Sequence, residues 1–169
     1  MWEGKIRIFF LLALFALLLL PTVALADVAI DSTNFPDAGF RAYVQSRAAS
    51  PTNITTAEIA AVTIISVSAS SISDLTGIEH FTALKQLDCA NIGITVLDVQ
   101  YNTALERLNC SNTGITALDV TANTALVELY CYNTGITALD VSQNTALRWL
   151  DCYNTGITAL DVSQNTALR

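Results

Sequence analysis

The stretch "LVELYCYNTGITALDVSQNTA" at 126–146 is followed at once by "LRWLDCYNTGITALDVSQNTA" at 147–167. Two earlier stretches share its pattern, "LKQLDCANIGITVLDVQYNTA" at 84–104 and "LERLNCSNTGITALDVTANTA" at 105–125. The four units repeat with a period of 21 residues, and "LR" at 168–169 begins another copy. Such a period is typical of a solenoid, in which each repeat forms one coil that stacks on its neighbours.

Each unit has apolar residues at positions 1, 4, 6, 11, 14 and 16, counted from its first leucine. Positions 4 and 6 alternate with polar or aromatic positions 3, 5 and 7, which predicts a short strand with one buried face. Asn at position 8 and Gly at position 10 predict a turn after the strand, and "NTA" at positions 19–21 predicts the return turn. One unit cannot bury its own apolar face, so we expect a stack of parallel strands.

The pattern LxxLxCxNTGITALDV resembles the leucine-rich repeat, and most closely the 21-residue type of secreted bacterial surface proteins related to the internalins. The resemblance covers residues 62–169 and implies an α/β solenoid, with parallel strands on the concave face and a short, irregular convex side. The family usually has Asn at position 9, where this sequence has Ile92, Thr113, Thr134 and Thr155. Threonine can make similar hydrogen bonds and isoleucine cannot, so we expect this hydrogen-bond ladder to be interrupted at Ile92.

Two segments precede the 21-residue units. Residues 62–83 form a 22-residue unit whose extra residue falls on the return side, so that coil should differ in curvature. Residues 27–61 do not fit the repeat and predict an N-terminal helical cap over the apolar end of the stack. Pro36 suits the first turn of one helix, and Thr55 and Glu58 have the spacing of a capping box at the start of another.

Residues 1–26 predict a secretory signal peptide. Lys5 and Arg7 precede an apolar run at 8–20, and the segment closes with Ala-Leu-Ala at 24–26. The 13-residue run is shorter than the roughly 20 residues that a membrane span needs, which favours cleavage after Ala26 over an uncleaved signal anchor. We therefore expect a secreted or cell-surface protein, bacterial by resemblance, with no membrane segment after cleavage.

The expected mature chain, 27–169, carries 14 acidic and 6 basic residues, hence a net charge of −8. A surface this acidic disfavours contacts with phosphate, and therefore disfavours nucleic acid and anionic lipid as partners.

The cysteines all occupy position 6, which predicts inward-pointing side chains: Cys89, Cys110, Cys131 and Cys152. Neighbouring strands lie ~4.8 Å apart, whereas the two Cβ atoms of a disulfide lie ~3.8 Å apart. We therefore favour a buried column of free thiols in the core over disulfides. A metal site is disfavoured further, because there is no nearby histidine and no Cys-x-x-Cys.

Acidic residues and the single histidine offer no catalytic site. Aspartates recur at position 15, where each is expected to accept a hydrogen bond from a turn amide rather than to bind calcium: Asp98, Asp119, Asp140 and Asp161. His80 has no Cys, Ser or Asp partner in a recognisable catalytic arrangement. We expect no catalytic residue, no metal and no cofactor, so the sequence argues against an enzyme.

The outward positions 3, 5 and 7 become aromatic in the later units. Tyr132 should lie beside Tyr153, and Trp149 should lie diagonally across from Tyr130. Exposed Trp and Tyr are typical of binding hot spots, and flat rings also suit sugars. The candidate ligand-binding residues on the concave face are Trp149, Tyr130, Tyr132, Tyr153, Arg107, Glu128 and Asp151.

The function predicted from these residues and from the resemblance is a binding module for a protein or glycan ligand, used in adhesion or host interaction. The alternative is a passive spacer in a larger surface protein. Because Arg169 is only the second residue of a coil, we also expect a truncated chain or an unseen partner. The uncovered last coil is an exposed strand edge, so end-to-end association is a further expectation.

Overall fold

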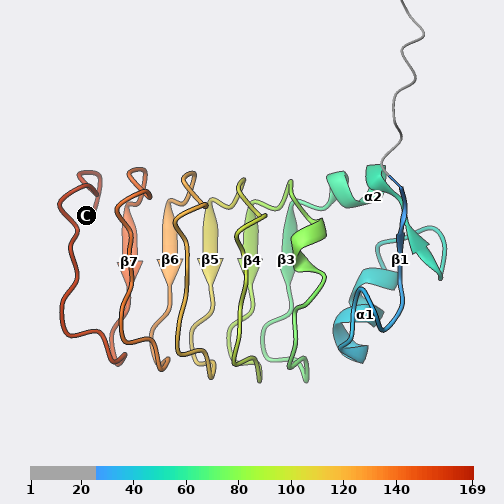
Figure 1. The fold of residues 1–169 in the computed structure, drawn as a ribbon, viewed down its shortest axis with the longest axis horizontal. Coiled ribbons are helices and arrows are strands. Elements are labelled where there is room, and N and C mark those ends of the chain that lie inside the picture. Colours follow the sequence, from blue (N-terminus) through green and yellow to red (C-terminus); the bar gives the residue numbers. More distant parts are fainter. Residues whose placement is uncertain (1–25) are drawn as a thin grey trace, which may run out of the picture.

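The computed structural model describes residues 26–169, so the predicted signal peptide lies outside the described residues except for Ala26. Five short parallel strands stand side by side in one sheet, in the order in which they occur in the sequence (Figure 1). Their bounds are β3 Ile64–Ser66, β4 Gln86–Asp88, β5 Arg107–Asn109, β6 Glu128–Tyr130 and β7 Trp149–Asp151. Each coil adds one strand, which confirms the predicted leucine-rich-repeat solenoid.

The register of the sheet follows the repeat. Leu87 pairs with Leu108, and Leu129 pairs with Leu150, each partner lying 21 residues further along the chain. Between β3 and β4 the offset is 22 residues, since Ile65 pairs with Leu87. This longer unit carries the 3₁₀ helix η1 (Ile78–His80) on its return side, and the expected difference in curvature stays a prediction.

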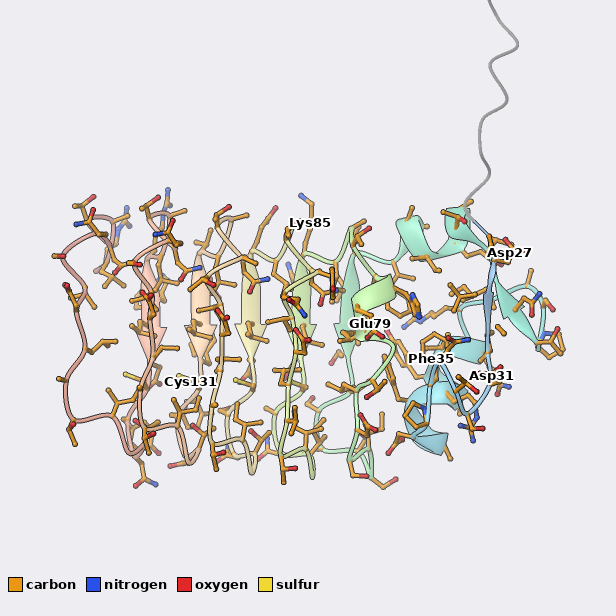
Figure 2. The ribbon with its side chains drawn as sticks, viewed as in Figure 1. Asp27, Asp31, Phe35, Glu79, Lys85 and Cys131 are labelled. Atoms are coloured by element: carbon orange, nitrogen blue, oxygen red, sulfur yellow. The ribbon has the colours of Figure 1, made fainter. Side chains whose placement is uncertain are left out.

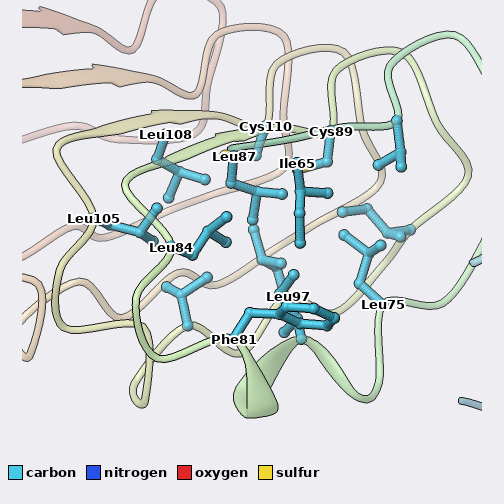
Figure 3. Packing of buried hydrophobic residues seen from close by; sticks show 14 of the residues in the cluster. Ile65, Leu75, Phe81, Leu84, Leu87, Cys89, Leu97, Leu105, Leu108 and Cys110 are labelled. Carbon is cyan, nitrogen blue, oxygen red and sulfur yellow. The ribbon is translucent and has the colours of Figure 1, made fainter. Parts of the chain in front are cut away.

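The core is a continuous column of side chains inside the coils. Leu84, Leu87 and Ile65 fill the space between the strand side and Phe81, and all four are buried (Figure 3). Every fully buried Leu or Ile contributes about 1.5–3 kcal/mol relative to an exposed one. The apolar positions of successive units therefore join into one core, and stacking supplies the burial that a single unit lacks.

The turn after each strand depends on asparagine. Asn91, Asn112, Asn133 and Asn154 all adopt left-handed backbone angles, with φ between 52° and 59°. Asn is among the few residues other than Gly that adopt this conformation readily. The side chains also bond between coils: Nδ2 of Asn133 donates to Oδ1 of Asn112 at 2.7 Å. Position 8 thus forms the turn that the sequence predicts.

The glycine at position 10 serves a different purpose from the one its turn context suggests. Gly114, Gly135 and Gly156 do not have positive φ. A Cβ on Gly135 would lie 3.0 Å from Cγ2 of Thr116 and 3.3 Å from the carbonyl oxygen of Ile115. The glycine therefore permits close approach of the preceding coil.

Replacing Gly135 with alanine is expected to lower the free energy of unfolding by about 1–3 kcal/mol, the usual cost of overpacking. The measurement is urea unfolding followed by circular dichroism. Gly93→Ala is the matched control, because its Cβ would meet nothing closer than Cβ of Ser73 at 3.6 Å. Equal losses in the two variants would contradict the steric explanation.

A second, buried asparagine column lies at position 19, on the return side. Asn102, Asn123, Asn144 and Asn165 are almost completely buried. Each Nδ2 donates to two carbonyls of the preceding coil; Asn144 donates to Val120 at 2.9 Å and to Asn123 at 2.8 Å. We call these four residues the asparagine ladder. The predicted return turn is present, and the asparagine ladder is an addition that the sequence pattern does not predict.

The threonines at position 9 do not join adjacent coils. Oγ1 of Thr113 donates to the carbonyl of Cys110 at 2.6 Å, and Thr134 bonds in the same way to Cys131 at 2.7 Å. Both bonds stay within one coil, while Ile92 is simply buried. Asparagine side chains at positions 8 and 19 make the hydrogen bonds between coils instead.

The N-terminal region packs against the first coil (Figure 1). It comprises β1 (Val28–Ala29) and β2 (Asn53–Ile54), which pair antiparallel, and the helices α1 (Ala38–Gln45) and α2 (Thr56–Ala61). The predicted capping box of Thr55 and Glu58 is present at the start of α2. Asp37 is the N-cap of α1, so Pro36 precedes the helix rather than lying in its first turn as the sequence suggests.

Asp37 also joins α1 to the first coil. Its Oδ1 accepts hydrogen bonds from the amides of Gly39 and Phe40, while its Oδ2 accepts one from the amide of Ser73 at 3.0 Å.

Within residues 26–169, no helix has the length and apolar character needed to cross a bilayer.

Candidate functional site

The surface of the strands is made by the side chains that the sheet directs away from the core. Three rows run across it. Position 3 contributes Gln86, Arg107, Glu128 and Trp149; position 5 contributes Asp88, Asn109, Tyr130 and Asp151; position 7 contributes Ala90, Ser111, Tyr132 and Tyr153. All four aromatic residues of these rows lie in the last two units, whereas Ala90 and Ser111 are small and buried.

The predicted contact between Tyr132 and Tyr153 is present. Their rings stack with centroids 5.3 Å apart and planes inclined by 18°. Trp149 pairs with Glu128 and so lies diagonally from Tyr130, as predicted. Trp149 is 53% exposed and Tyr153 is 61% exposed. The rings of Trp149 and Tyr153 are therefore largely exposed to solvent on this face.

A second cluster joins a cation, a carboxylate and a ring. Nη1 of Arg107 lies 3.2 Å from Oε2 of Glu128, and the guanidinium carbon lies 5.3 Å from the centroid of Tyr130. The hydroxyl of Tyr130 donates to the same Glu128 oxygen at 3.3 Å. Burial and the nearby Glu128 raise the pKa of Tyr130, so the phenol keeps its proton and remains a donor. The spacing of the residues does not predict this cation–π contact.

Position 5 shows which side chains shape the turn. Oδ1 of Asp88 accepts the amide hydrogen of Ala90 at 3.2 Å, and Oδ1 of Asp151 accepts that of Tyr153 at 3.4 Å. Asn109 does the same for Ser111. Tyr130 has no side-chain oxygen close enough to its own backbone to accept such a bond. The third 21-residue unit therefore lacks this turn hydrogen bond and presents an aromatic ring instead.

These residues surround a shallow pocket of about 530 Å³. It contains five of the seven predicted binding residues, while Trp149 and Glu128 lie on the same face outside its lining. Asn109 is an addition to the predicted set, and its place in the position 5 row is the signal that identifies it. The pocket is lined by Arg107, Asn109, Tyr130, Tyr132, Asp151 and Tyr153.

Another hollow of about 530 Å³ lies on the return side, between the 22-residue unit and the next one. Val96 and Tyr101 are exposed in its wall, at 77% and 57%. Its carboxylates already serve the backbone: Asp74 accepts from Thr76, and Asp98 from Gln100. We take the concave pocket as the candidate site, because three tyrosine rings line it, whereas Tyr101 is the one aromatic ring among the residues that line the return-side hollow.

The four cysteines are free thiols in the structure. Cys89, Cys110 and Cys131 are buried, whereas Cys152 is partly exposed in the last coil. Cys131 is marked in Figure 2, and Cys89 lies beside Cys110 in Figure 3. The thiol of Cys89 donates to the carbonyl of Asn109 at 3.3 Å. Burial raises the pKa of Cys89 to about 12, so these thiols act as core residues rather than as nucleophiles.

The aspartates at position 15 make the predicted turns. Oδ1 of Asp140 accepts the amide hydrogen of Ser142 at 2.9 Å, and the other three units repeat this bond. The Ser142 backbone hydrogen bond holds the pKa of Asp140 below its ordinary value. Across residues 26–169, no group of three or more His, Cys, Asp or Glu side chains is placed to hold a metal ion. His80 packs edge-on against Phe35, with ring centroids 5.7 Å apart.

The structure is similar to the functional domain of InlJ from Listeria monocytogenes, which is described as including a cysteine ladder. The TM-score is 0.79 at 39% identity, over 86% of this chain and 32% of the InlJ chain. The fold is that of an internalin-like leucine-rich-repeat protein. This internalin-like chain thus spans about a third of the length of the InlJ structure.

Two further solved structures support the fold of the internalin-like chain. The internalin InlF of Listeria monocytogenes matches with a TM-score of 0.66 at 24% identity, over 87% of this chain and 52% of its own. A leucine-rich-repeat protein of Leptospira interrogans matches with a TM-score of 0.61 at 21% identity, over 66% of this chain and 31% of its own. No protein-family model and no curated protein sequence matches the chain.

Proposed function

We propose that this internalin-like domain is a binding module that holds a protein ligand on its concave face. We propose further that it acts outside a bacterial cell, in adhesion or host interaction. The observation that carries the proposal is the aromatic surface of β6 and β7. Four rings gather there although none is needed to fill the core: Tyr130, Tyr132, Trp149 and Tyr153.

The arrangement of these rings fits recognition better than catalysis. Trp, Tyr and Arg dominate the energetics of protein interfaces, because they bury much area at little conformational cost. The pocket is shallow and has a polar edge formed by Arg107 and Asn109. The nucleophile and base that hydrolytic chemistry needs are not paired among its lining residues. Secretion is supported by the sequence of residues 1–26, and a surface location by the internalin-like fold.

The double substitution Trp149→Ala with Tyr130→Ala tests the proposal. Immobilised protein is exposed separately to biotinylated surface proteins of epithelial cells and to a glycan array, and the bound material is identified. If the concave face binds a protein, the variant should lose that ligand by about tenfold or more, because hot-spot truncations commonly cost at least that much.

The matched control carries Val96→Ala and Tyr101→Ala, which remove comparable exposed side chains from the return side. It should bind as the unchanged protein does. Retention of every ligand by the concave variant would favour a passive spacer. If the concave variant loses only a bound glycan, the ligand of this face is a sugar rather than a protein.

A further inference from the structure

We infer that the concave pocket takes a cationic side chain, arginine or lysine, from the protein ligand, with Asp151 as its ion-pair partner. This inference rests on the proposed function and adds the chemistry of one subsite to it. The protein already contains one such cation site, formed by its own side chains. Arg107 already occupies such an arrangement, with its guanidinium over the Tyr130 ring and an oxygen of Glu128 3.2 Å away.

On the next strand, β7, a carboxylate again lies beside aromatic rings, but no cation accompanies it. Asp151 pairs with Tyr130 across the sheet, and Trp149 and Tyr153 flank it on its own strand side. Its carboxylate accepts only the Tyr153 amide hydrogen, at the long distance of 3.4 Å. Among residues 26–169, the ion pairs are Lys85 with Glu106 and Arg107 with Glu128, so Asp151 has none.

The charges and rings around Asp151 favour a cation over other ligands. The face of a tyrosine ring carries negative electrostatic potential, and a ring beside a carboxylate adds to the attraction. Arg107, the one cation in the pocket lining, already has Glu128 as its ion-pair partner. The net charge of residues 27–169 is −8, which attracts a basic partner over longer distances.

The geometry of the rings supports the same ligand. Tyr132 and Tyr153 stack at 5.3 Å, which leaves no room for a group between them and makes their outer surface a flat wall. A planar guanidinium can lie on such a wall while its N–H groups reach a carboxylate in the plane. Arginine therefore fits better than lysine, whose ammonium is a compact, strongly hydrated charge.

The test uses three short probes against the ¹⁵N-labelled chain. They are acetyl-Gly-Arg-Gly-amide, the same peptide with neutral citrulline in place of arginine, and tri-N-acetylglucosamine. Chemical shifts of the Tyr130, Asp151 and Tyr153 amides report binding. We expect the arginine peptide to shift these amides, the citrulline peptide to bind at least about tenfold more weakly, and added salt to weaken the arginine complex.

Asp151→Asn should weaken arginine binding by about tenfold or more while the rest of the spectrum stays unchanged. Asp88→Asn is the matched control: Asp88 accepts the same kind of turn hydrogen bond, but its neighbours Gln86 and Ala90 carry no ring. It should leave binding unaltered.

Absence of shifts with the arginine peptide, equal binding of citrulline, or unchanged binding by Asp151→Asn each overturns the cation subsite. Shifts of these amides by the sugar alone overturn it in favour of a glycan. The proposed function fails separately, namely if the Trp149 and Tyr130 double variant keeps every protein ligand. A double variant that loses its ligand while the Asp151 variant keeps it leaves a binding face without this subsite.

Discussion

Iodoacetamide added to the native protein at mildly alkaline pH should modify Cys152 first and leave Cys89, Cys110 and Cys131 as thiols. The thiolate is the reacting species, and burial raises the pKa of Cys89 and of Cys131 from 9.0 to about 12. A thiol with so high a pKa is almost entirely protonated at this pH. Burial also raises the pKa of Cys110 well above its ordinary value. It raises the pKa of Cys152 too, but the Cys152 side chain is partly exposed and can be reached by the reagent.

Peptide mass spectrometry after timed quenching measures the four rates. The control is the same reaction in denaturant without reductant, in which all four cysteines should react at similar rates. Finding none or only two reactive thiols there would contradict the thiol column and show disulfides. Rapid modification of Cys110 in the native protein would show that the middle coils open more easily than their packing indicates.

Asn144→Ala is expected to lower the free energy of unfolding by about 2–4 kcal/mol. The substitution removes two hydrogen bonds between coils, to the carbonyls of Val120 and Asn123, and leaves a small cavity. Each carbonyl keeps one bond from its own turn, from the amides of Asn123 and Leu126 respectively. Loss of Oδ1, which is buried without a partner in the described structure, offsets part of the cost.

Urea unfolding measures this change, with Gln143→Ala as the matched control. Gln143 is the neighbouring amide but is exposed, and its only hydrogen bond is a long one of 3.4 Å to Ser142. That variant should stay within about 0.5 kcal/mol of the unchanged protein. Similar losses in the two variants would mean that the asparagine ladder does not hold adjacent coils together.

The repeat alone predicts much of the fold, because identical spacing forces identical placement in successive coils. Once Cys131 and Cys152 share position 6, Leu129 must pair with Leu150 and Tyr132 must lie beside Tyr153, as the sheet register has it. The cluster of Arg107, Glu128 and Tyr130 could not be predicted in this way. It depends on how two long side chains turn towards a ring, and spacing along the chain does not fix that choice.

The asparagine ladder was missed for a different reason. Asn144 stands in "SQNTA", a polar stretch that predicts an exposed turn, and the turn is indeed present. Buried side chains that bond to backbone carbonyls give no apolar periodicity. The available signal was invariance within the chain: position 19 is Asn in every 21-residue unit, while position 18 is Tyr101, Ala122, Gln143 or Gln164. A polar residue that never changes, beside a position that accepts Tyr, Ala or Gln, indicates a structural role.

The hydrogen bonds of the asparagine ladder all run in one direction along the stack. Asn165 donates to carbonyls of residues 141 and 144, and Asn144 to those of residues 120 and 123, so each amide looks back to the coil made before it. A coil that leaves the ribosome finds the acceptors for its asparagine already in place in the coil before it. We therefore expect each folded unit to template the next, so that folding proceeds from the N-terminal end as the chain is delivered.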